Sequence, residues 1–182
     1  MLLKQNFVAF SLLILSYILV DAFNHADLSV GNLLFLPLGA TLYAYLSFSK
    51  GVVASVILAN TLVGYFFWGN WFGNGLDGFI GHVLIGSFAP LFAIYSVKSL
   101  KLDSPRQNYW QQLVLLSLLS AIFNTLGKFF SFIDTLIESI DPLIFLGSFM
   151  LGDILGCLVF IYVADRFLTP RLKRQGLQSS AH

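Results

Sequence analysis

Six apolar stretches, each about long enough to cross a bilayer, set the first constraint on this sequence. A hydrocarbon core about 30 Å thick requires about 20 predominantly apolar residues, and lipid offers the backbone no hydrogen-bond partner outside a helix. The sequence therefore predicts an all-α, polytopic membrane protein built as a six-transmembrane-helix bundle. The predicted helices are Asn6 to Phe23, Leu28 to Phe48, Val52 to Trp68, Leu76 to Val97, Tyr109 to Lys128 and Leu143 to Leu168.

The composition argues against a water-soluble domain. Hydrophobic residues make up 57% of the 182 residues and charged residues only 10%, against roughly 45–50% and 25% in soluble domains. The sequence also lacks the short motifs of zinc proteases, serine hydrolases and nucleotide-binding loops. We therefore predict a non-enzymatic protein with no cofactor, no metal site and no nucleic-acid partner.

The positions of the charges predict the orientation in the membrane. With six helices, nine of the ten basic residues fall on one side, which the positive-inside rule assigns to the cytoplasm. They are Lys4, Lys50, Lys98, Lys101, Arg106, Arg166, Arg171, Lys173 and Arg174, and Lys128 is the only basic residue predicted on the opposite, acidic side. The expectation is a bacterial inner-membrane protein with both termini in the cytoplasm.

The last third of the chain is predicted to contain a short amphipathic helix and a basic C-terminal tail. Between the fifth and sixth helices, Phe129 to Asp141 alternates apolar and acidic residues at helical spacing, which predicts a short amphipathic helix on the outer surface. Pro142 then suits the first position of the next helix. We expect one transmembrane domain over residues 1–168 and a basic cytoplasmic tail over 169–182.

Asp153 is the strongest candidate for a functional residue. It lies near the middle of the last predicted helix, and a charge at that depth costs at least about 2.5–3.5 kcal/mol unless it faces protein or water. Gly152 and Gly156 beside it form a small-residue stripe that lets another helix approach closely. Two interpretations stay open: a hydrogen-bonded carboxyl that fixes helix packing, or a site for a ligand, ion or proton.

Other polar and helix-breaking residues extend the candidate site. Residue counting places His82, Asn60 and Asn124 in the outer half of the membrane, where they could contact Asp153. Pro37 with Gly39 is predicted to interrupt the second helix, and Pro90 the fourth. Such breaks can line a cavity, although proline and glycine are also common in transmembrane helices. Cys157 is interpreted as a core residue.

Two stretches of the sequence resemble a known family. The stretch from Leu36 to Phe48 (LPLGATLYAYLSF), followed by Lys50-Gly51-Val52-Val53 and Ala59-Asn60, is similar to the bacterial membrane-associated sensor domain of the first type. The segment Met150 to Leu158 (MLGDILGCL) resembles the closing helix of that family. The resemblance implies a sensory or partner-binding membrane module, usually fused to a histidine kinase or a diguanylate cyclase. It would place Pro37, Gly39, Asn60, Gly152, Asp153 and Gly156 in the shared core.

This sequence departs from the family pattern in having six predicted helices where eight are expected and only about fourteen residues after the last one. The expected function is thus a stand-alone sensor or accessory subunit, binding a small ligand, a partner membrane protein or a cytoplasmic signalling protein. One alternative is a small transporter or the substrate-binding subunit of a vitamin or ion uptake system. Another is a structural subunit of a larger membrane complex.

Overall fold

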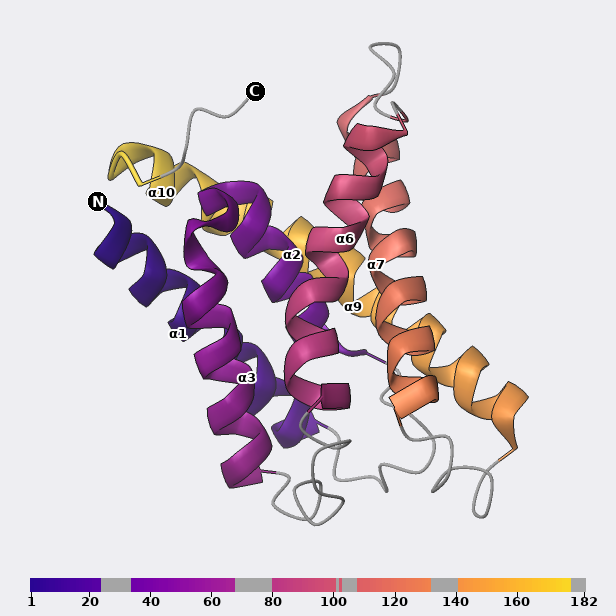
Figure 1. Cartoon of the computed structure of the whole chain (residues 1–182). Helices are drawn as coiled ribbons and strands as arrows, with labels where there is room; N and C mark the ends of the chain where they lie inside the picture. Colours follow the sequence, from indigo (N-terminus) through magenta and orange to yellow (C-terminus); the bar gives the residue numbers. More distant parts are fainter. Residues whose placement is uncertain (24–33, 68–79, 101, 103–107, 132–140, 178–182) are drawn as a thin grey trace.

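A computed structural model describes residues 1–23, 34–67, 80–100, 102, 108–131 and 141–177. Every element in this part of the chain is helical (Figure 1). In chain order the elements are α1 (Leu2–Phe23), α2 (Leu36–Phe48), the 3₁₀ turn η2 (Ser49–Val52), α3 (Val53–Phe67), the π-helical turn η3 (Ile80–Ile85), α6 (Gly86–Ser99), α7 (Tyr109–Ser131), α9 (Pro142–Phe167) and α10 (Thr169–Arg174).

Four helical stretches are long and apolar enough to cross a membrane. They are Leu2–Ala22, Leu36–Phe66, Tyr109–Ser131 and Pro142–Phe167, and Val83–Ser99 is a shorter apolar helix. Large apolar side chains remain exposed along these helices, including Phe7, Phe66, Phe92, Val114 and Val159. Apolar surface on so many helices is unfavourable in water and suits contact with lipid tails. The fold is therefore that of a helical membrane protein.

The predicted second helix is wrong at its start. Leu28 to Phe48 was expected to be helical, but Leu34 and Phe35 are not helical and α2 begins only at Leu36; residues 28–33 lie outside the described part. Pro37 consequently lies in the first turn of α2 rather than interrupting a helix, at a position where its missing amide costs little. At 1.5 Å per residue the 13 residues of α2 span only about 20 Å.

The fourth predicted helix also differs from its prediction. Residues 76–79 lie outside the described part, and the rest forms η3 followed by α6. Pro90 lies inside α6, which continues to Ser99, so the expected interruption is not a break. The π-helical turn lies directly before α6, and local π adjustments are one way in which transmembrane helices accommodate proline. The amphipathic segment predicted over Phe129 to Asp141 lies outside the described residues except at its two ends.

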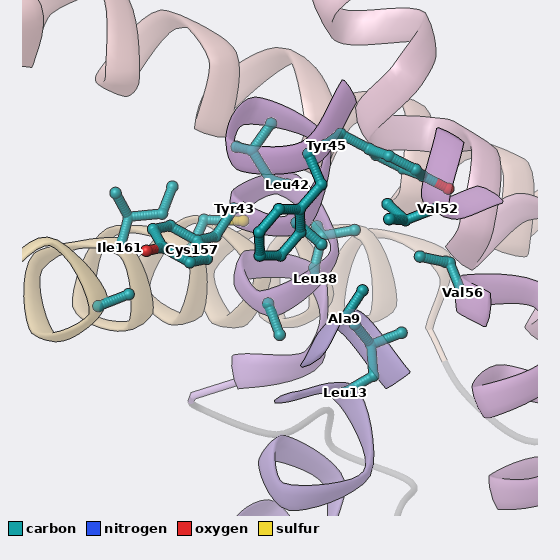
Figure 2. Packing of buried hydrophobic residues seen from close by; sticks show 14 of the residues in the cluster. Ala9, Leu13, Leu38, Leu42, Tyr43, Tyr45, Val52, Val56, Cys157 and Ile161 are labelled. Atoms are coloured by element: carbon teal, nitrogen blue, oxygen red, sulfur yellow. The ribbon is translucent and has the colours of Figure 1, made fainter. Parts of the chain in front are cut away.

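The short helix α2 occupies the centre of the bundle. Eleven of its residues are buried. It packs mainly against α9 and α1 and also contacts α6 and α7, and α7 in turn packs against both α9 and α6. Figure 1 shows that the chain turns back at η2, so the long apolar stretch is two helices rather than one straight span. Figure 2 shows Leu38 and Leu42 of α2 in the same apolar cluster as Leu13 of α1 and Cys157 of α9.

The C-terminal segment closes one end of this bundle. In the helix α10 and the residues after it, Leu172 and Leu177 are buried in the main apolar core. The Gln5 side chain of α1 donates a 2.7 Å hydrogen bond to the Leu177 carbonyl, and the hydroxyls of Tyr43 and Thr169 lie 2.9 Å apart. The described part of the predicted basic tail is thus an integral part of the fold, with Arg171, Lys173 and Arg174 left exposed.

Candidate polar site in the bundle interior

Asp153 faces protein, as the sequence predicts. Its side chain is only 1% exposed, while Leu151 and Leu155 on the same helix are 50% and 39% exposed. The carboxylate therefore lies on the inner face of α9, and the outer face carries the apolar side chains. This placement allows polar partners from the neighbouring helices to reach it.

Two side chains of α7 hold the carboxylate. The Asn124 amide donates a hydrogen bond of 2.8 Å to Asp153 Oδ2, and the Thr125 hydroxyl donates one of 3.3 Å to the same oxygen. Asn124 and Thr125 are themselves 0% and 2% exposed. Hydrogen bonds that end on a charged acceptor are stronger than those between neutral groups. The prediction that Asn124 is a partner of Asp153 is confirmed.

Lys128 belongs to the same cluster, a role that the sequence did not predict. It lies on α7 one helical turn beyond Asn124 and is only 3% exposed. Its ammonium lies 4.7 Å from the ring centre of Phe35 and 5.8 Å from that of Phe149, an arrangement that stabilises a desolvated cation. It also interacts electrostatically with Asp153. Because α7 runs on to Ser131, Lys128 lies inside the helix rather than at its predicted end.

The glycine stripe of α9 admits a second backbone, as predicted. Phe35 donates a backbone hydrogen bond of 3.0 Å to the Gly152 carbonyl, and a Cβ atom added at Gly156 would overlap the Phe35 backbone. A Cβ added at Gly39 would lie 2.8 Å from the Gly156 carbonyl oxygen. The start of α2 is therefore set directly against Gly152 and Gly156, beside Asp153. This contact brings the Phe35 ring to the Lys128 ammonium.

Asn60 does not bond to Asp153 but forms a neighbouring network. Its amide oxygen accepts a 2.8 Å hydrogen bond from the Tyr17 hydroxyl, and its amide nitrogen donates one of 2.8 Å to Ser87. The Tyr45 hydroxyl bonds the Ser87 carbonyl. Tyr17 links the Asn60 network to the Asp153 cluster. Its ring packs edge-on against Phe35, with the ring centres 6.0 Å apart, and it interacts electrostatically with Asp153. Asn60 is thus near the site without being a direct partner of the carboxylate.

Of the remaining predicted site residues, all but one have a side chain that the structure describes. Pro37 and Gly39 lie in the first turn of α2, next to the glycine stripe. The backbone of His82 is part of η3, but its side chain lies outside the described residues, so its predicted contact with Asp153 stays a prediction. Cys157 is buried in the core, as expected. Among the described residues, no group of three or more His, Cys, Asp or Glu side chains is placed to hold a metal.

Sequence reasoning missed Lys128, Thr125 and Phe35. A signal for Lys128 was present, because Ser117, Ser120, Asn124 and Lys128 recur at spacings of three and four residues, on one helical face. That face is polar within an otherwise apolar helix, which indicates burial against protein. Phe35 carried no such signal, since nothing in the local sequence ties it to α9.

These features define a class: a helical membrane protein with oppositely charged side chains buried between its helices. Comparison of the chain with protein-family models, with curated proteins and with solved structures finds no match. The resemblance to the sensor family therefore stays a prediction drawn from the two sequence stretches that carry it.

Proposed function

We propose that this chain is a non-enzymatic sensor or accessory subunit of the bacterial inner membrane. In this proposal it binds a small ligand or a partner membrane protein within the bundle, at the cluster of Asp153, Asn124, Thr125 and Lys128. The observation that carries the proposal is the burial of Asp153 and Lys128 together. Charged side chains are costly to bury and apolar ones of similar volume are often as stable, so a role in binding gives a reason for keeping the charges.

The proposal includes six membrane crossings with both termini in the cytoplasm. Figure 1 supports this arrangement, because the N-terminus and the helix α10 lie at the same end of the bundle. Lys50, Lys98 and Arg166, at described helix ends or turns, are among the basic residues assigned to that side. The positive-inside rule then makes this end cytoplasmic. On this view α2 and α3 form two crossings, of which α2 is too short to span the hydrocarbon alone.

Ligand-dependent unfolding of the purified protein tests the binding role. A ligand that binds only the folded state raises its stability with concentration. Candidate vitamins and metal ions, each at several pH values, are screened for an increase in unfolding temperature in mild detergent. We expect a solute that stabilises the native protein and loses at least about tenfold in affinity with Asp153→Asn, the loss that a missing charged hydrogen bond gives.

The matched control is Thr61→Val on α3. The Thr61 hydroxyl bonds only the Ile57 carbonyl of its own helix, at 2.8 Å, so its removal should leave the response unchanged. If Asp153→Asn binds every stabilising solute as the native protein does, Asp153 is not in the site. If no solute stabilises the protein, co-purification with and without Asp153→Ala tests the partner role, and a chain that stays alone in both forms contradicts the proposal.

A second candidate function is transport, and one feature of α2 favours it. This helix begins at Leu36, inside the bundle, after the non-helical residues Leu34 and Phe35. Many secondary transporters bind their substrates at the ends of such discontinuous helices near the membrane midplane. Uptake of a stabilising solute into proteoliposomes separates the candidates: accumulation above that in protein-free vesicles indicates a carrier, whereas saturable binding without uptake favours the sensor or accessory role.

A further inference from the structure

Among the residues that the structure describes, three buried polar atoms on α7 have no hydrogen-bond partner. They are the hydroxyl oxygens of Ser117 and Ser120 and the amide oxygen of Asn124. All three side chains are 0% exposed. Their spacing of three and four residues puts them on one face of the helix, which continues directly to the Asp153 cluster. Leaving such groups unpaired in an apolar surrounding is unfavourable, because burial removes them from water without giving them a partner.

The two serines differ from other hydroxyl side chains of this bundle. In five of these side chains the hydroxyl bonds a carbonyl of its own helix, which satisfies it without any outside partner. This holds for Ser16, Thr41, Thr61, Ser131 and Ser148, at distances of 2.7 to 3.2 Å. Ser117 and Ser120 do not make this bond, although a helix offers it at every position. Their hydroxyls are therefore free to bind something other than their own helix.

The charges beside this face indicate what kind of molecule it suits. The carboxylate of Asp153 already accepts hydrogen bonds from Asn124 and Thr125 and interacts electrostatically with Lys128. An added cation would compete with the Lys128 ammonium, and an added anion would meet the Asp153 carboxylate. The unpaired groups themselves are neutral: one amide oxygen that needs a donor and two hydroxyls that can donate or accept.

We propose that the face formed by Ser117, Ser120 and Asn124 binds a small uncharged solute with hydrogen-bonding groups. The solute donates a hydrogen bond to Asn124 Oδ1 and exchanges hydrogen bonds with the two serine hydroxyls. This inference rests on the proposed function, because it names the class of ligand held next to the Asp153 cluster. It also requires that small uncharged molecules reach this face from the surrounding medium.

Cysteine labelling tests this requirement and the preference for uncharged molecules. The single cysteine, Cys157, is replaced by alanine, and Ser120→Cys is introduced as a nearly isosteric change. The control is Ala121→Cys, since Ala121 is the next residue of α7 and is equally buried at 0% exposure. Ser99→Cys, at the exposed end of α6, corrects for the intrinsic rates of the reagents. The probes are methyl methanethiosulfonate, which is uncharged, and its aminoethyl and sulfonatoethyl analogues, which are charged.

Thiols react as thiolates, so a cysteine in a dry apolar contact is modified slowly. We expect the uncharged reagent to modify Ser120→Cys at least about tenfold faster than Ala121→Cys, because a thiolate needs a polar surrounding. The charged reagents should show no such difference. Ser117→Cys is measured in parallel, and only variants that elute as a single folded species are compared.

Two results would overturn the inference. Equal, slow modification of Ser120→Cys, Ser117→Cys and Ala121→Cys means that the serine face is a closed helix contact. Modification by the charged reagents as fast as by the uncharged one means that the face admits ions. Neither result depends on Asp153, so failure here is distinguishable from failure of the binding role, which the Asp153→Asn titration measures.

Discussion

Gly156→Ala is expected to destabilise the bundle by at least about 3 kcal/mol, the upper part of the range for overpacking a core. The added methyl group would overlap the backbone of Phe35, and a backbone held by its own hydrogen bond to Gly152 cannot move aside as a flexible side chain can. The start of α2 would have to leave α9, and the Phe35 ring would leave Lys128 with it. The measurement is reversible unfolding in mixed micelles.

Gly147→Ala is the matched control, because it lies on the same helix and has no atom within 4 Å of an added Cβ. Alanine is the better helix former by about 1 kcal/mol, so this variant should be as stable as the native protein or slightly more stable. Equal stability of Gly156→Ala and Gly147→Ala would show that Phe35 does not lie against Gly156.

Replacing Asp153 with leucine is expected to cost about 3–5 kcal/mol, the usual loss when a buried charge is left uncompensated. The Lys128 ammonium would stay desolvated, with only the rings of Phe35 and Phe149 for compensation. Asp153→Leu combined with Lys128→Met should recover most of the lost stability, since the second change removes the unpaired charge.

A double-mutant cycle with Lys128→Met measures this coupling, for which neighbouring residues give about 0.5–3 kcal/mol. Strictly additive effects of Asp153→Leu and Lys128→Met would show that the two charges do not interact. Thr61→Val serves again as the reference, because its hydroxyl bonds only its own helix. Its effect should add to that of Asp153→Leu without coupling.

The long helices could be located from the sequence because apolar length is a local property. The third predicted helix, Val52 to Trp68, is α3 over Val53–Phe67, and the sixth, Leu143 to Leu168, is α9 over Pro142–Phe167. Pro142 lies in the first turn of α9, and Asp141 caps it by accepting a 2.8 Å hydrogen bond from the Leu143 amide. The prediction of this helix start is confirmed.

The start of α2 could not be located in the same way. Hydropathy does not distinguish a segment that faces lipid from one enclosed by other helices, because both are apolar. The residues around Leu34 and Phe35 therefore look like the continuation of a helix. Pro37 was the local signal for a helix start, but it was interpreted as an interruption.

The candidate site could be predicted in part. Asp153 and Asn124 were found because polar groups at membrane depth need protein partners. Counting residues along a helix estimates depth but not the rotation of each helix about its axis. Asn60 therefore has a plausible depth, yet its partners are Tyr17 and Ser87. Lys128 was missed because it lies at the predicted end of its helix, where it was counted among the charges of the outer side.

The hydrogen bond between Gln5 and Leu177 has a consequence for how this protein is made. Its two residues are separated by 172 positions, so α1 enters the membrane while its buried polar partner has yet to be synthesised. At roughly 5–20 residues per second, that delay is about ten to thirty seconds. The first helix is therefore incompletely packed during this time. Its packing is complete only after the ribosome has synthesised the C-terminal residues.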